Sequence, residues 1–233
     1  YGVADILSGA VSPSGHLTDT YAVKNANSPA AQNFGDLQWT NANPDIKMND
    51  AIVEAENIYI GYKYYETRYF DTVMNQGNAS STVGSSTGSA WNYDDEVTYP
   101  FGYGLSYTAF QYGDLNVKKL GETDYYVSFS VKNVGRHVAS EIVQVYIADD
   151  ASMVTRPRKE LVAFGKKRLE VGETCTFGFN LTERDFAYFS PVLNEFYVEN
   201  GTFTILIGAS SADIRLQEKV EIKLPDEKQF SQY

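Results

Sequence analysis

The sequence is poor in the residues that build metal and redox sites, with one cysteine and two histidines among 233 residues. The single Cys175 excludes an internal disulfide and a cysteine-rich zinc site. It lies in an alternating pattern, which favours a small buried hydrophobe over a reactive thiol. Neither His16 nor His137 has a metal-binding spacing, so we expect no metal and no cofactor. A chain without disulfides is compatible with both the cytosol and secretion.

Positive charge and long apolar runs are also scarce. The chain has 19 Lys and Arg against 30 Asp and Glu, a formal net charge of -11. This acidic balance argues against nucleic acid or an anionic membrane surface as a partner. No apolar run approaches the roughly 20 residues of a membrane helix. The remaining composition, 43% hydrophobic and 21% charged, is that of a globular protein with one large or two small domains.

Aromatic residues are abundant, and 18 Tyr with 13 Phe favour a protein rich in β-strands. In the second half of the chain, five segments alternate with a period of two and are separated by turn signals. These segments are residues 125–133, 141–148, 174–181, 202–207 and 216–224. Short strands at this spacing predict a β-sandwich of about 100 residues, beginning near residue 108.

The first nine residues predict the last turns of a helix. Val3, Ile6 and Leu7 form an apolar stripe at i, i+3 and i+4, and Gly9 is placed for a left-handed C-terminal cap. A helix this short needs a packed partner, so the chain is expected to begin inside a domain.

The segment up to residue 93 contains loops and one predicted strand. Residues 10–50 are turn-rich, with at most one short strand, whereas residues 57–65 alternate and predict a strand. Residues 75–93 are mostly small, polar or glycine and predict a flexible surface loop. Trp91 and Tyr93 at its end are candidates for ligand contact, since exposed aromatic rings on loops often bind ligands. The alternative is that they anchor the loop to the body of the protein.

Several short motifs suggest functional sites, but each of them is weak evidence for one. Ser14, His16 and Asp19 are too local for a catalytic triad. Gly102-Tyr-Gly104 lacks the further glycine, lysine and helix of a phosphate loop and predicts a tight, aromatic-packed turn. Asp149-Asp150 indicates a solvated strand end rather than a weak calcium site. The basic residues 156–159 indicate a strand end or a domain interface.

Three Asn-x-Ser/Thr triplets, including the one at Asn78, occur at about the frequency expected by chance. No carboxylate pair stands out for glycoside hydrolysis.

Six segments, in order, resemble the C-terminal part of glycoside hydrolase family 3, the β-glucosidase and β-xylosidase group. The most specific is Tyr99-Pro-Phe-Gly-Tyr-Gly-Leu-Ser-Tyr107. The others are residues 4–17, residues 56–65, residues 131–135 with 141–146, residues 156–164, and residues 201–211 with 213–215. Together they cover nearly the whole chain.

The resemblance implies a mainly β chain with three parts. Residues 1–70 resemble the C-terminal portion of the family's α/β sandwich domain, and residues 71–108 resemble the connection. Residues 109–233 resemble the fibronectin type III-like domain, which agrees with the β-sandwich predicted from periodicity. The stretch from Asn75 to Tyr93 looks longer than the usual connection.

The resemblance also implies which residues are absent. The family's nucleophile is an Asp in a (β/α)8 barrel, and its acid/base Glu lies upstream of the matching segment. Neither position is matched here, so no catalytic residue is assigned; Glu56 and Glu66 lie on matching segments, where a structural role is favoured.

The chain is therefore predicted to be the non-catalytic C-terminal portion of a retaining β-glucosidase-like enzyme. It would complete the α/β sandwich domain and brace a barrel that hydrolyses terminal non-reducing β-D-glucosyl or related residues. The implied partners are a barrel-bearing chain and a β-glucoside or oligosaccharide, with a homo-oligomer as a further option. The alternative is a stand-alone carbohydrate-binding or adhesion module that uses Trp91 and Tyr93.

Overall fold

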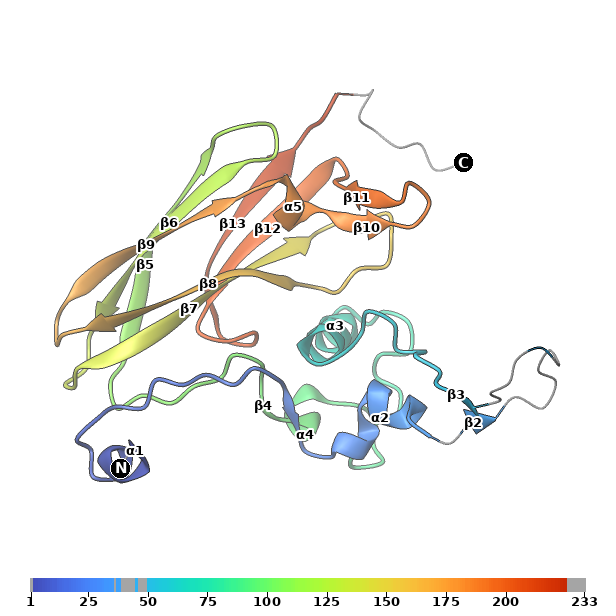
Figure 1. Cartoon of the computed structure of the whole chain (residues 1–233), viewed down its shortest axis with the longest axis horizontal. Helices are drawn as coiled ribbons and strands as arrows, with labels where there is room; N and C mark the ends of the chain where they lie inside the picture. Colours follow the sequence, from blue (N-terminus) through green and yellow to red (C-terminus); the bar gives the residue numbers. More distant parts are fainter. Residues whose placement is uncertain (1, 36, 39–44, 46–49, 226–233) are drawn as a thin grey trace. The chain divides into compact units, whose positions relative to one another are not determined.

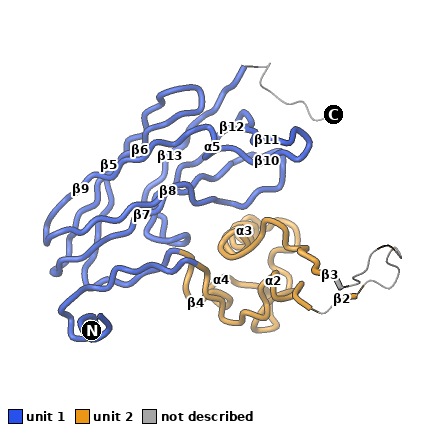
Figure 2. The backbone as a smooth tube through the Cα atoms, in the orientation of Figure 1, with its two compact units in different colours: residues 1–18, 102–233 blue, residues 19–101 orange. Residues whose placement is uncertain are grey.

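The computed structural model describes residues 2–35, 37–38, 45 and 50–225. The chain divides into two compact units (Figure 2), one formed by residues 1–18 with 102–233 and the other by residues 19–101. The first unit is therefore discontinuous in sequence, since its N-terminal segment lies with the C-terminal half of the chain. The family-level domain boundaries at 70/71 and 108/109 stay a prediction.

The first unit is built around an antiparallel β-sandwich (Figure 1). One sheet has the strand order β13-β12-β7-β8 and the other the order β5-β6-β9. The strands are β5 Phe110–Lys119, β6 Tyr125–Asn133, β7 Ala139–Asp149, β8 Glu160–Leu169, β9 Thr174–Leu181, β12 Gly201–Gly208 and β13 Ile214–Ile222. A short helix, α5 Glu183–Phe186, and a hairpin, β10 Tyr188–Ser190 with β11 Glu195–Tyr197, follow β9. The mainly β fold class predicted from the sequence is confirmed.

Alternation along the strands builds the core of the sandwich. In β6, Val127, Phe129 and Val131 are at most 1% exposed and face the same side. Phe129 stacks on Phe177 of β9, with 5.8 Å between ring centroids and 15° between planes. Five strands appear where the sequence predicts them.

The sequence did not predict β5 and β8. A register shift between Gly113 and Asn116, with Asp114 at a φ of 52°, interrupts the alternation of β5. β8 contains three exposed basic residues, 166–168, just before its buried last residue Leu169, and they obscure the apolar pattern of its first half.

At the end of β7, the acidic pair Asp149 and Asp150 forms salt bridges with basic residues of the segment 156–159. Arg156 lies 3.4 Å from a carboxylate oxygen of Asp149, and Arg158 lies 3.4 Å from one of Asp150. The Asp149 side chain is only 4% exposed, so the expectation of a solvated strand end is wrong for this residue. Burial raises the pKa of Asp149, although the Arg156 charge acts in the opposite direction. No cluster of three or more metal-ligating residues occurs in the described part of the chain.

The N-terminal segment of the first unit begins with the predicted helix, α1 Gly2–Leu7. Gly9 follows with a φ of 79°, which confirms the left-handed cap. Val3 and Leu7 are 74% and 81% exposed, whereas Ile6 is half-buried, so the described chain covers only part of the apolar stripe. None of the described helices is long and apolar enough to cross a membrane.

The second unit contains short elements around one longer helix. These are β1 Tyr21–Ala22, 3-10 helix η1 Asn25–Asn27, α2 Pro29–Asn33, β2 Leu37–Gln38, β3 Asp50–Ala51, α3 Tyr62–Val73, α4 Tyr93–Glu96 and β4 Val97–Tyr99. β1 pairs with β4, and β2 pairs with β3, in both cases antiparallel.

The strand predicted over residues 57–65 is wrong, because α3 begins at Tyr62 and residues 57–60 form a turn and an irregular segment. The alternation came from tyrosines that also satisfy a helical period. Tyr62, Tyr65 and Tyr69 recur at i, i+3 and i+7, and each packs on another aromatic ring of this unit. Gly61, with a φ of 50°, turns the chain into the helix.

Candidate functional site

Helix α3 is held in the second unit by a small aromatic core. Tyr65, Trp91 and Val97 are buried together, and Trp91 is 2% exposed. The guanidinium of Arg68 lies 4.7 Å from the centre of the Trp91 ring, a cation–π contact. Trp91 is therefore buried in the body of this unit, as expected if it anchors the loop that precedes it. The assignment of Trp91 and Tyr93 to substrate contact stays a prediction.

Arg68 ties the loop after α3 back onto the helix. Its Nε donates to the Ala79 carbonyl at 2.8 Å, and its Nη2 donates to the Ser81 carbonyl at 3.1 Å. Its Nη1 donates to the Tyr64 hydroxyl at 2.6 Å. A charged donor on three oxygens fixes this part of the loop, which composition alone predicted to be flexible.

Two glutamates of this unit accept hydrogen bonds from neighbouring segments. The Tyr93 hydroxyl donates to Glu66 Oε1 at 2.6 Å, and Glu66 is 3% exposed. Burial and the adjacent Glu66 carboxylate raise the pKa of Tyr93 well above its ordinary value. Asn33 donates to Glu56 at 2.6 Å. Both contacts support the structural roles expected for these glutamates.

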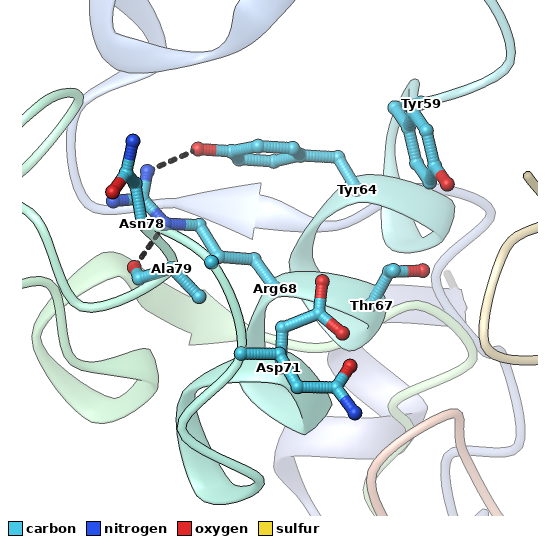
Figure 3. Close-up of a pocket in the computed structure, with 9 residues that line it drawn as sticks. Tyr59, Tyr64, Thr67, Arg68, Asp71, Asn78 and Ala79 are labelled. Atoms are coloured by element: carbon cyan, nitrogen blue, oxygen red, sulfur yellow. Dashed lines mark hydrogen bonds between the residues drawn. The ribbon is translucent and has the colours of Figure 1, made fainter.

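A cavity of about 330 Å³ opens beside α3 (Figure 3). Tyr64, Thr67, Arg68 and Asp71 line it from one face of the helix, at i, i+3, i+4 and i+7. The segment 76–79 forms the opposite wall, and Tyr59 contributes from the turn before the helix.

The far wall of the cavity exists because the chain reverses directly after α3. Asn75 and Gly77 adopt left-handed backbone, with φ values of 55° and 52°, and the bond from Arg68 to Ala79 secures the returning segment.

Among the residues that the structure describes, Asp71 is the only carboxylate that lines this cavity. Burial raises the pKa of the Asp71 carboxyl above its ordinary range. Figure 3 shows the carboxylate pointing into the space between Arg68 and Thr67. Arg68 supplies one positive charge nearby, so the formal charges of the lining residues cancel.

A polar network of the first unit contains His16 and Gly102, two residues that belong to motifs considered in the sequence. His16 Nδ1 donates to the Gly102 carbonyl at 2.6 Å, and Gln144 Nε2 donates to the same carbonyl at 3.0 Å. Burial lowers the pKa of His16, which favours the neutral ring. Its ring nitrogen is committed to a backbone carbonyl, so His16 has a structural role.

The two glycines of the Gly102-Tyr-Gly104 turn are required by close approach. Gly102 has a φ of 79°, and a Cβ there would collide with the side chain of Gln144. A Cβ at Gly104 would collide with the ring of His16. The predicted tight turn is confirmed, and the side chains that the two added Cβ atoms would meet are those of Gln144 and His16.

Sequence reasoning missed the cavity residues Arg68 and Asp71. The signal was present as a helical spacing of polar and aromatic residues from 64 to 71, but the start of this stretch was interpreted as a strand. In the sequence Asn78 is part of an Asn-x-Ser triplet, and in the structure it lines the cavity.

Comparisons with known proteins agree with this fold. Residues 141–211 match the fibronectin type III-like domain. The thermostable β-glucosidase B of Acetivibrio thermocellus is 38% identical over 94% of the chain, which spans 25% of that protein. An exo-α-(1->6)-L-arabinopyranosidase of Bifidobacterium longum is 33% identical over 91% of the chain, which spans 23% of it.

Solved structures give the same result. The chain superimposes on the family 3 β-glucosidase of Bifidobacterium adolescentis with a TM-score of 0.75 and 34% identity, covering 94% of this chain and 27% of that one. For the β-glucosidase of Kluyveromyces marxianus in complex with glucose, the TM-score is 0.73 and the identity 31%, covering 95% and 23%.

The chain thus spans about a quarter of the length of the curated relatives it matches. The whole-chain superpositions include both compact units, so the likeness is not limited to the fibronectin-like sandwich. This chain belongs with the C-terminal part of the glycoside hydrolase family 3 enzymes, which carries a fibronectin type III-like domain.

Proposed function

We propose that this chain is a non-catalytic portion of a retaining β-glucosidase-like hydrolase. It completes the α/β sandwich domain, braces a catalytic barrel, and so supports hydrolysis of terminal non-reducing β-D-glucosyl or related residues. The observation that carries the proposal is the match of nearly the whole chain to about a quarter of each relative.

The described residues support a bracing role more than a chemical one. Glu56 and Glu66 each accept a hydrogen bond from a neighbouring segment, and Glu96 accepts from the backbone and hydroxyl of Ser86. These bonds organise the second unit around α3. In this proposal the nucleophile and the acid/base belong to a barrel-bearing partner chain or to another part of the same polypeptide.

A complementation experiment tests the proposal. The A. thermocellus β-glucosidase B is truncated to remove the quarter that this chain matches, and the isolated chain is added or co-expressed. We expect no turnover of p-nitrophenyl β-D-glucopyranoside by either piece alone and turnover by the mixture. Turnover by the isolated chain, or a folded mixture without activity, would refute the proposal.

The alternative of a stand-alone sugar-binding module that uses Trp91 and Tyr93 has less support. The Tyr93 hydroxyl already donates to the buried Glu66. The Trp91 ring is 2% exposed and offers little surface for stacking on a sugar. We therefore do not propose Trp91 as a stacking platform.

A further inference from the structure

We propose that the cavity beside α3 is a binding site for a neutral, polyhydroxylated ligand the size of one sugar ring. The proposal rests on the size of the cavity, on its balanced charge, and on the hydrogen-bonding groups that the protein leaves unused. It concerns this chain's own residues and stands whether or not the chain acts with a catalytic barrel.

The size and lining suit a small ring. The volume of about 330 Å³ lies near the lower end of the range of ligand pockets, roughly 300–1,000 Å³. Tyr59 and Tyr64 present aromatic surface to it, against which the C–H faces of a sugar can pack. Tyr59, Tyr64 and Asp71 all line the cavity, so it offers both apolar and polar recognition groups.

The charges argue against ionic ligands. Three of the five N–H groups of Arg68 already donate to protein oxygens, which weakens Arg68 as a bidentate site for a phosphate or a carboxylate. The same positive charge disfavours an organic cation beside Asp71. A calcium site also draws its affinity from several carboxylates, and among the described residues only Asp71 brings a carboxylate to this cavity.

The unused groups match hydroxyls. Within the described part of the chain, the Asp71 carboxylate accepts no hydrogen bond and forms no ion pair. The Tyr64 hydroxyl accepts from Arg68 and keeps its own hydrogen to donate. The Asn78 amide can both donate and accept, and its side chain has no partner among the described residues. A vicinal diol could donate to Asp71 while its oxygens accept from Tyr64 and Asn78.

Titration of the 233-residue chain with single sugars tests the proposal. D-Glucose, D-galactose, D-xylose and L-arabinose are added separately and followed by saturation-transfer NMR and calorimetry. We expect at least one to bind in the millimolar range, and Asp71→Asn to weaken that binding about tenfold, because a charged acceptor is lost. Asn78→Ala, in an exposed segment, should weaken it about threefold or more.

Asp94→Asn is the matched control, because Asp94 is an exposed aspartate of the same unit outside the cavity. It should bind like the unmodified chain. Circular dichroism verifies that each variant is folded. Absence of sugar binding would overturn the proposal. So would folded Asp71→Asn and Asn78→Ala variants that bind the sugar as tightly as the unmodified chain. Preferential binding of inorganic phosphate or tetramethylammonium would overturn it too.

Discussion

Replacing Arg68 by methionine should loosen the loop that follows α3. The substitution keeps an unbranched apolar stem but removes the donors to Ala79, Ser81 and Tyr64 and the charge over Trp91. Hydrogen bonds from a charged donor contribute about 1.5–3 kcal/mol each. A cation–π contact adds about 0.5–2 kcal/mol.

The full sum overstates the loss. Arg68 is only half-buried, and the released carbonyls can bind water instead. We therefore expect the free energy of unfolding of the second unit to fall by roughly 2–4 kcal/mol, the contribution of one or two such bonds.

Tryptophan fluorescence can follow this unit separately. The sequence has two tryptophans, so a Trp39→Phe background leaves Trp91 as the reporter. Trp91 is 2% exposed and should emit at short wavelength in the native chain. Arg68→Met should shift that emission to longer wavelength and lower the urea midpoint.

Arg168→Met is a suitable control, because the Arg168 side chain is 67% exposed and pairs only with an exposed glutamate. Its cost should stay below about 0.5 kcal/mol. An Arg68→Met variant with unchanged emission and the stability of this control would refute the anchoring role of Arg68.

Three further predictions concern the first unit. Gly102→Ala should lower the free energy of unfolding in urea more than Gly172→Ala does. Both glycines have a φ near +80°, but only at Gly102 would the added Cβ collide with a neighbouring side chain, that of Gln144. Equal losses would contradict this close approach. Arg156→Met should cost about 3 kcal/mol because it leaves the buried Asp149 unpaired, and adding Asp149→Asn should recover part of this loss. Burial lowers the pKa of His16 in the folded chain below 6.5, so the unfolded chain takes up the proton first as the pH falls below that value. The contribution of His16 to the free energy of unfolding should therefore be lost over this range. Measured against pH, the loss should be smaller in His16→Gln.

The sandwich was predictable because its strands are buried on alternate residues. Phe129 and its neighbours in β6 repeat every second position, and this local pattern needs no knowledge of partners. β5 was hidden by its bulge at Asp114, where a φ of 52° shifts the period. Elements whose pattern is local and regular could be predicted, and those interrupted by a backbone irregularity could not.

The cavity was not predictable, because its residues share a wall only if 62–73 is a helix. Tyrosines at 62, 64 and 65 fit a strand as well as a helix, and packing decides between them. The partners of Arg68 are backbone carbonyls of the loop, which no residue type reveals. The burial of Trp91 likewise depends on a contact with Arg68, which is distant in sequence.

Fractionation of material from the native source tests the central claim most directly. Gel filtration with intact mass measurement is combined with an assay of p-nitrophenyl β-D-glucopyranoside turnover in every fraction. We predict that this chain elutes above its own 26.0 kDa, as part of a longer polypeptide or with a barrel-bearing partner, in the fractions that hold the activity. A stable 26.0 kDa monomer in fractions separate from all β-glucosidase activity would contradict the account.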